Sequence, residues 1–165
     1  MSRIRVGMGY DVHPFGGDGN LVLGGVELEH ARLAGHSDAD AVAHAVTDAV
    51  LGAAGLPDLG TLFPASDDQW KGVSSLGFLE HAAKLVLDKG WWIVNVHCVV
   101  TAEAPKLAPH LAAMADNLRD AMRVAQEPMG GPIDVVVTPK HGEGMGAVGR
   151  GEGIACWAVA LLERG

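Results

Sequence analysis

Stretches with the two-residue period of a β-strand alternate along this chain with stretches that have the period of a helix. This alternation limits the fold more than any other feature. Strands are expected at residues 3–12, 21–23, 26–28, 91–101, 133–138 and 151–162, with a turn at 16–20, and helices at about 38–54, 74–89 and 107–126. Such an order predicts an α/β or α+β class, with one mixed sheet and helices packed on one side. A chain of 165 residues without repeats or linkers predicts a single domain over residues 1–165.

The helix expected from about residue 38 has the clearest limits. Ser37, followed three residues later by Asp40, resembles a capping box at its start, and a Gly-Leu-Pro sequence is expected to stop it. Asp40, His44 and Asp48 follow one another at intervals of four, so they share one face of this helix. Polar side chains aligned on one helix face can contribute to the same site.

Composition and charge exclude several classes of partner. The net charge of −8 would not attract nucleic acid or an anionic membrane. We see no apolar run of the length of a signal peptide or a membrane span. Cys98 and Cys156 stand in apolar stretches without a CxxC motif, so they predict buried, reduced thiols and a cytoplasmic protein.

The best candidate for chemistry combines Asp11, His13 and His44. Side chains alternate along a strand, so Asp11 and His13 point the same way. One carboxylate and two imidazoles suit a zinc ion whose fourth position stays open for a substrate oxygen. Asp48, one turn beyond His44, is expected to accept the spare ring N–H of that ligand. The alternative is a turn acid beside two hydrogen-bonded histidines.

Other candidates each have two interpretations. His36 and Ser37 either form an anion site at a helix N-terminus, or are an exposed residue and a cap. Asp58, in the long segment 57–72, is either a turn residue or an acceptor for sugar hydroxyls. Lys106 is either solvated or used for binding. The G-x-G-x-x-G match at 144–149 is rejected, because the residues after it predict a strand rather than a helix.

In order and spacing, several motifs together resemble the 2-C-methyl-D-erythritol 2,4-cyclodiphosphate synthases, enzymes of the non-mevalonate isoprenoid pathway. The similarity runs nearly end to end. The motifs are GYDVH at 9–13, HSDAD at 36–40, HAVTDAVLGAA at 44–54, DLG at 58–60, APK at 104–106 and GRGEG at 149–153.

This resemblance implies an α/β (α+β) sandwich with a mixed four-stranded sheet, assembled as a homotrimer with active sites at the subunit interfaces. In the family, the 2-phosphate of 4-diphosphocytidyl-2-C-methyl-D-erythritol 2-phosphate attacks the β-phosphate, which forms a cyclic diphosphate and expels CMP. Two cofactors are implied. Zn²⁺ would be bound by Asp11, His13 and His44, and Mg²⁺ or Mn²⁺ between the substrate phosphates would be placed by Glu143.

The resemblance also implies where the substrate would be held. His36, with the backbone of Ser37, would hold the phosphates and stabilise the transition state. The methylerythritol end would lie at Asp58, Leu59 and Gly60, under a flap from Phe63 to Asp67. The cytidine pocket would be formed by Ala102, Ala104, Pro105, Lys106, Leu107 and Ala108. Arg150 would lie near the threefold axis, where family members hold an isoprenoid diphosphate.

The chain departs from the family just before Glu143. A Thr-rich stretch that contacts the phosphates is replaced by Pro139, Lys140, His141 and Gly142, with His141 at the position of a transition-state-stabilising threonine. Three interpretations are open: Lys140 and His141 supply cationic donors to phosphate in place of hydroxyls, Pro139 re-routes the loop and weakens nucleotide binding, or Thr138 takes the threonine's place after a shift of register. Ala65 replaces a usual acid, and Ala147 replaces an aromatic residue of the axial cavity, which disfavours isoprenoid binding.

Two other functions remain open beside the cyclodiphosphate synthase. One is a zinc-dependent phosphoesterase on the same scaffold, in which water attacks the phosphate. The other is a trimer that binds cytidine nucleotides and metal but releases no CMP.

Overall fold

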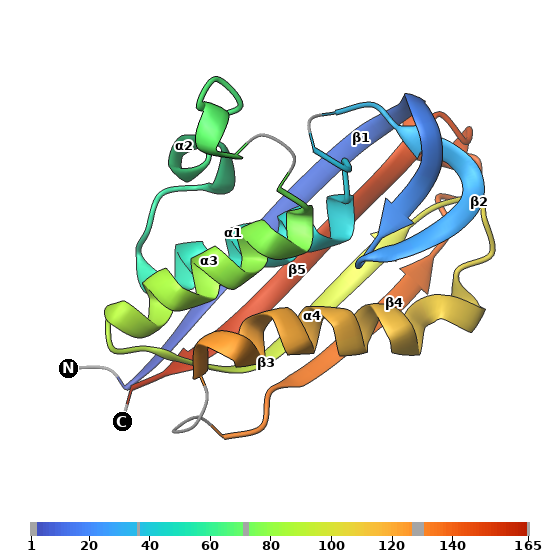
Figure 1. Ribbon diagram of the computed structural model, residues 1–165. Helices are drawn as coiled ribbons and strands as arrows, with labels where there is room; N and C mark the ends of the chain where they lie inside the picture. Colours follow the sequence, from blue (N-terminus) through green and yellow to red (C-terminus); the bar gives the residue numbers. More distant parts are fainter. Residues whose placement is uncertain (1–2, 36, 71–72, 127–130, 165) are drawn as a thin grey trace.

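The computed structural model describes residues 3–35, 37–70, 73–126 and 131–164 (Figure 1). In this part of the chain one sheet has the order β2-β1-β5-β3-β4, with β3 and β4 parallel and the other neighbours antiparallel. The strands are β1 (Ile4–Leu23), β2 (Val26–Leu33), β3 (Trp92–Thr101), β4 (Asp134–Lys140) and β5 (Gly153–Glu163). The predicted mixed sheet is confirmed, but it has five strands rather than four.

The additional strand comes from the N-terminal hairpin. The turn predicted at residues 16–20 is wrong, because β1 continues through this stretch and its pairing with β2 shifts register there. Gly16 and Gly19 have φ of 139° and 101°, a backbone that glycine adopts at little cost. The glycines therefore act as bulges within a long strand. β2 in turn extends well beyond the short strand expected at 26–28.

Three long helices cover one face of the sheet (Figure 1). They are α1 (Ala41–Ala54), α3 (Ser75–Asp88) and α4 (Leu111–Gln126). The shorter helical turns are α2 (Leu59–Leu62), η1 (Asp68–Trp70), η2 (Ala108–His110) and α5 (Gly146–Gly149). The expected stop of α1 is confirmed, since Gly55 caps it with φ of 70°. α5 has only four residues and leads into β5, in agreement with the rejected dinucleotide motif.

Asp40, rather than Ser37, caps the start of α1. Its buried carboxylate accepts hydrogen bonds from the N–H groups of Val42 and Ala43, and also from those of Gly24 and Gly25 in the β1–β2 turn. Burial raises the pKa of Asp40, while these N–H groups favour its charged form. One side chain thus joins the beginning of α1 to the hairpin.

α1 lies unusually close to β1. A Cβ atom at Gly9 would be 1.9 Å from the carbonyl oxygen of Ala45, and one at Gly7 would be 2.1 Å from that of Ala49. Only glycine fits under a helix at this separation. The contact holds the helix that carries His44 directly over the strand that carries Asp11.

The sheet face opposite the helices carries a row of exposed apolar side chains. β1 contributes every second residue, including Val6 (62% exposed) and Met8 (70% exposed), and β5 contributes Trp157 and Val159. The ring of Trp157 contacts that of Tyr10, with centroids 5.2 Å apart. An apolar surface of this kind on a folded chain indicates a contact with another molecule. Among the described helices, none has both the length and the apolar character needed to cross a membrane.

Candidate active site

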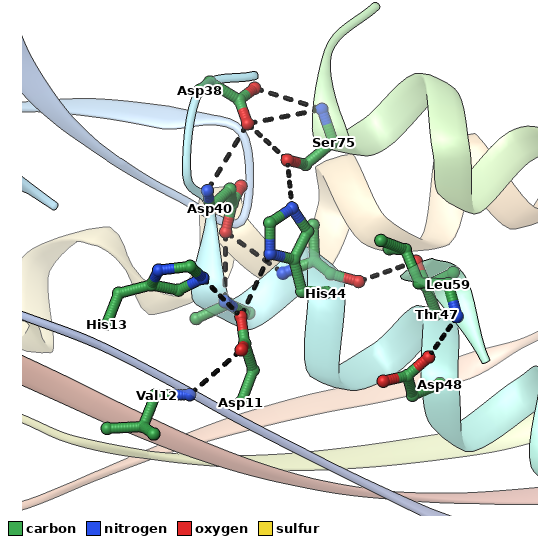
Figure 2. A network of polar contacts seen from close by, with 12 residues as sticks. Asp11, Val12, His13, Asp38, Asp40, His44, Thr47, Asp48, Leu59 and Ser75 are labelled. Carbon is green, nitrogen blue, oxygen red and sulfur yellow. Dashed lines mark hydrogen bonds and ion pairs between the residues drawn. The ribbon is translucent and has the colours of Figure 1, made fainter. Parts of the chain in front are cut away.

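Asp11, His13 and His44 converge as predicted (Figure 2). The Oδ2 atom of Asp11 lies 3.1 Å from Nε2 of His13 and 3.0 Å from Nδ1 of His44. The other oxygen, Oδ1, accepts a hydrogen bond from the N–H of Val12, which fixes the orientation of the carboxylate. All three side chains are partly buried at the contact between β1 and α1.

The hydrogen-bond partners of the two imidazoles show which of their nitrogens are available to a cation. Nδ1 of His13 lies 2.7 Å from the carbonyl oxygen of Ala34, which can only accept, so Nδ1 carries a proton and Nε2 is the nitrogen that can turn a lone pair to a cation. Nε2 of His44 lies 2.9 Å from the hydroxyl oxygen of Ser75. One carboxylate oxygen and two ring nitrogens therefore converge, and the two nitrogens that now contact Asp11 can each give up a proton and present a lone pair when a cation binds between them.

The electrostatics of the triad agree with this assignment. Burial by itself would raise the pKa of Asp11, but hydrogen bonds and charge interactions with His13 and His44 hold it well below its usual range. The hydrogen bond to Asp11 raises the pKa of His13, against the opposing effect of burial. The carboxylate is therefore ionised under ordinary conditions, as a metal ligand must be.

The donor set and its spacing fit a zinc ion. Ligand atoms of tetrahedral zinc lie about 2.0–2.1 Å from the metal, which places them roughly 3.3 Å from one another. The two contacts of Asp11, at 3.0 and 3.1 Å, are close to that separation. Three protein ligands also leave one position for a substrate, the arrangement of a catalytic rather than a structural zinc.

The expected role of Asp48 is wrong. Its carboxylate accepts a hydrogen bond of 2.7 Å from the N–H of Leu59 and has no described bond to His44 (Figure 2). The spare nitrogen of His44 instead contacts Ser75, at the start of α3. Burial raises the pKa of Asp48, and the nearby Asp58 and Asp11 add to this shift against the opposing N–H of Leu59.

A cavity of about 590 Å³ opens beside the triad. Its wall includes the predicted site residues Ser37, Leu59, Gly60 and Phe63, with further lining from Asp48, Ala65, Asp68, Trp70 and Phe78. Asp58 caps α2 through the N–H of Thr61, which lowers the pKa of Asp58. The described lining contains carboxylates but no lysine or arginine.

The residues predicted to bind the nucleotide form a second group. They follow the ends of β3 and β4, which are joined by a hydrogen bond from the N–H of Ala102 to the carbonyl oxygen of Lys140. The N–H of Gly142 donates to the carboxylate of Glu103. None of this second group lines the cavity of the same chain. Its members are Ala102, Ala104, Pro105, Lys106, Leu107, Ala108, Lys140, His141, Gly142, Glu143 and Arg150.

Comparison with known proteins identifies the family of this chain. A model of the YgbB family matches residues 4–163. The chain belongs to the YgbB family. It is 47% identical over 165 residues to a 2-C-methyl-D-erythritol 2,4-cyclodiphosphate synthase of Synechococcus elongatus, with 99% of each chain covered. The resemblance inferred from the motifs is thereby confirmed.

Solved structures with the same fold support the YgbB assignment. A 2C-methyl-D-erythritol-2,4-cyclodiphosphate synthase in a CDP-bound form has a TM-score of 0.83 at 36% identity, covering 96% of this chain and 100% of the other. The bifunctional IspDF of Campylobacter jejuni has a TM-score of 0.87 at 35% identity. This chain spans 42% of the length of that bifunctional protein.

Sequence reasoning missed several residues around the YgbB triad. Ser75 contacts His44 although the two are 31 residues apart, and Trp70 and Phe78 line the cavity. The serine pair at 74–75 signals only a helix start. Ser37 has φ of 57°, and its hydroxyl donates to the carbonyl oxygen of Val73. The predicted catalytic residue His36 lies outside the described residues.

Proposed function

We propose that this chain converts 4-diphosphocytidyl-2-C-methyl-D-erythritol 2-phosphate to 2-C-methyl-D-erythritol 2,4-cyclodiphosphate and CMP. An oxygen of the 2-phosphate forms a bond to the β-phosphorus, and the bond from that phosphorus to the oxygen bridging to CMP breaks. The observation that carries this proposal is the triad of Asp11, His13 and His44 beside a large cavity, in a YgbB chain. We take residues 1–165 as the single domain that performs the reaction.

Zinc held by the triad would withdraw charge from the β-phosphate as a Lewis acid. The chain itself would hold the reacting groups in line, so the reaction needs no covalent nucleophile. The hydroxyls of the methylerythritol would lie at the turn of Asp58, Leu59 and Gly60. Asp48 supports this role, because its bond to the N–H of Leu59 ties the turn to the helix that carries His44.

The phosphates and cytidine would be held by the second group of residues, supplied by a neighbouring subunit of a homotrimer. Two observations support this arrangement. The described wall of the cavity lacks lysine and arginine, and the second group does not reach it within one chain. Lys106, Lys140 and His141 would bring the missing positive charge, with His141 near the transition state and Glu143 placing Mg²⁺ or Mn²⁺. We place His36 and Ser37 beside the phosphates.

The exposed apolar face would form the contact between subunits. Met8→Glu introduces a charge at the most exposed apolar position of β1, and we expect it to convert the trimer to monomers. Val124→Glu, on α4 and 56% exposed, is a matched control that should leave the assembly unchanged. Light scattering coupled to size-exclusion chromatography measures both. A trimer that persists in Met8→Glu places the interface elsewhere.

Phosphorus NMR of the purified protein with the substrate, zinc and magnesium tests the reaction itself. We expect CMP together with a cyclic diphosphate. A linear phosphate product would identify a phosphoesterase instead. Intact substrate despite bound zinc would point to the Pro139–Gly142 loop, and to a binding role or a different phosphorylated substrate. We assign the protein to the cytoplasm, since Cys98 and Cys156 are both free thiols.

A further inference from the structure

His44 is held from both sides. Its Nδ1 faces Asp11, and its Nε2 lies 2.9 Å from the hydroxyl oxygen of Ser75 (Figure 2). Ser75 is fully buried, so its hydroxyl can bond only to the groups that surround it. The carboxylate of Asp38 accepts from that hydroxyl and also from the N–H of Ser75, at 3.1 Å to Oδ2.

The direction of this chain of bonds follows from the carboxylate. An ionised carboxylate is an acceptor only, so the single hydroxyl proton of Ser75 goes to Asp38. The hydroxyl oxygen must then accept from His44, so Nε2 of His44 carries a proton. Nδ1, which contacts Oδ2 of Asp11, is then the nitrogen that can lose its proton and present a lone pair to a cation at the centre of the triad.

We propose that Asp38 and Ser75 are positioning residues that fix the ring tautomer of His44 and so present its Nδ1 to zinc. The proposal rests on the zinc centre of the proposed function. It gives Asp38 and Ser75 the part that sequence reasoning assigned to Asp48. Neither residue touches the triad's centre, so their hydrogen bonds reach the metal through His44. The same part is played for His13 by the carbonyl oxygen of Ala34.

Asp38→Asn is the sharpest test, because it keeps the shape of the side chain but no longer requires the Ser75 hydroxyl to donate to it. The amide can donate to the hydroxyl oxygen of Ser75, which frees the hydroxyl proton to turn toward His44 and to favour the wrong tautomer. We expect zinc affinity, measured by competition with a chelator, to fall about 10- to 100-fold. Proton NMR of the zinc-bound protein should show the Nε2–H of His44, which Ser75 holds, exchanging with water faster in Asp38→Asn than in the unaltered protein.

Asp48→Asn is the matched control for loss of charge. It removes the same charge near the triad, but Asp48 has no described bond to His44. We expect a smaller loss of zinc affinity and an unchanged exchange rate of the Nε2–H of His44. Equal losses in the two variants would overturn the proposal, because charge alone would then explain both. If the unaltered protein binds no zinc, that result contradicts the proposed zinc site itself, and with it the role of Asp38 and Ser75.

Ser75→Ala removes the hydroxyl that connects Asp38 to His44 and provides a second test. Its control is Ser74→Ala, which removes the N-cap of the same helix, where the Ser74 hydroxyl accepts from the N–H of Gly77. Both variants should lower the midpoint of thermal unfolding, but only Ser75→Ala should also lose zinc affinity. Equal losses of zinc affinity in Ser75→Ala and Ser74→Ala would show that Ser75 only supports the structure of α3. Should Ser75→Ala fail to fold, the Asp38→Asn result decides alone.

Discussion

A His44→Ala variant is expected to lose both its zinc and its turnover. His44 is one of three ligands, and its Nδ1 lies 3.0 Å from the carboxylate oxygen that would share the metal. Altering only an outer hydrogen-bond partner of a metal ligand costs about 10- to 100-fold in affinity. Removing the ligand itself should cost more, so that zinc no longer survives purification. Elemental analysis of the purified protein measures the metal, and phosphorus NMR measures the product.

The control for this variant is His30→Ala. His30 lies on β2, where its ring contacts that of Phe15 at 4.9 Å between centroids, away from the triad. We expect full zinc content and turnover in His30→Ala. A normal zinc content in folded His44→Ala would contradict the ligand assignment. Zinc loss with normal turnover would show that the ion is structural rather than catalytic.

Local patterns predicted the elements well where neighbours in sequence determine them. The stop of α1 at Gly55 and the start of α3 at the serine pair need only a left-handed glycine and a cap. The start of α1 was misplaced because Asp40 bonds to Gly24 and Gly25, which are far away in sequence. The local sequence does not show whether Ser37 or Asp40 caps the helix, because the choice depends on the contact of Asp40 with this distant turn.

The candidate site was predicted in the same uneven way. Asp11 and His13 share a strand face, so period alone brings them together, and His44 was added as the second imidazole of a zinc donor set. The partner of His44 could not be found this way, since Ser75 begins a different helix. Asp48 was chosen because helical spacing favours it, but its carboxylate is engaged by Leu59. Contacts between elements depend on packing that sequence spacing does not record.

The second large effect is expected from Gly9→Ala, because a single methyl group would push α1 away from β1. The added Cβ would lie 1.9 Å from the carbonyl oxygen of Ala45 and 2.8 Å from the N atom of Ala49. Both atoms belong to the helix backbone and cannot rotate aside. Overpacking usually costs about 1–3 kcal/mol, and we expect at least the upper part of that range here.

Gly52→Ala is the matched control and should have the opposite sign. Gly52 lies inside α1, and its nearest neighbour to an added Cβ is the carbonyl oxygen of Met8 at 4.0 Å. Alanine in a helix interior is more favourable than glycine by about 0.5–1 kcal/mol. Urea denaturation measures the free energy of unfolding of both variants. Equal stability of Gly9→Ala and the unaltered protein would contradict the close contact of helix and strand.

Zinc binding extends the same experiment from the fold to the site. α1 carries His44, while β1 carries Asp11 and His13, so the separation of helix and strand sets the separation of the ligands. A displacement of α1 that satisfies the new methyl group at Gly9 must move His44 away from Asp11. We therefore expect folded Gly9→Ala to bind zinc more weakly, although no ligand has changed, and Gly52→Ala to bind it normally. Normal affinity in Gly9→Ala would show that the helix accommodates the methyl group without moving the site.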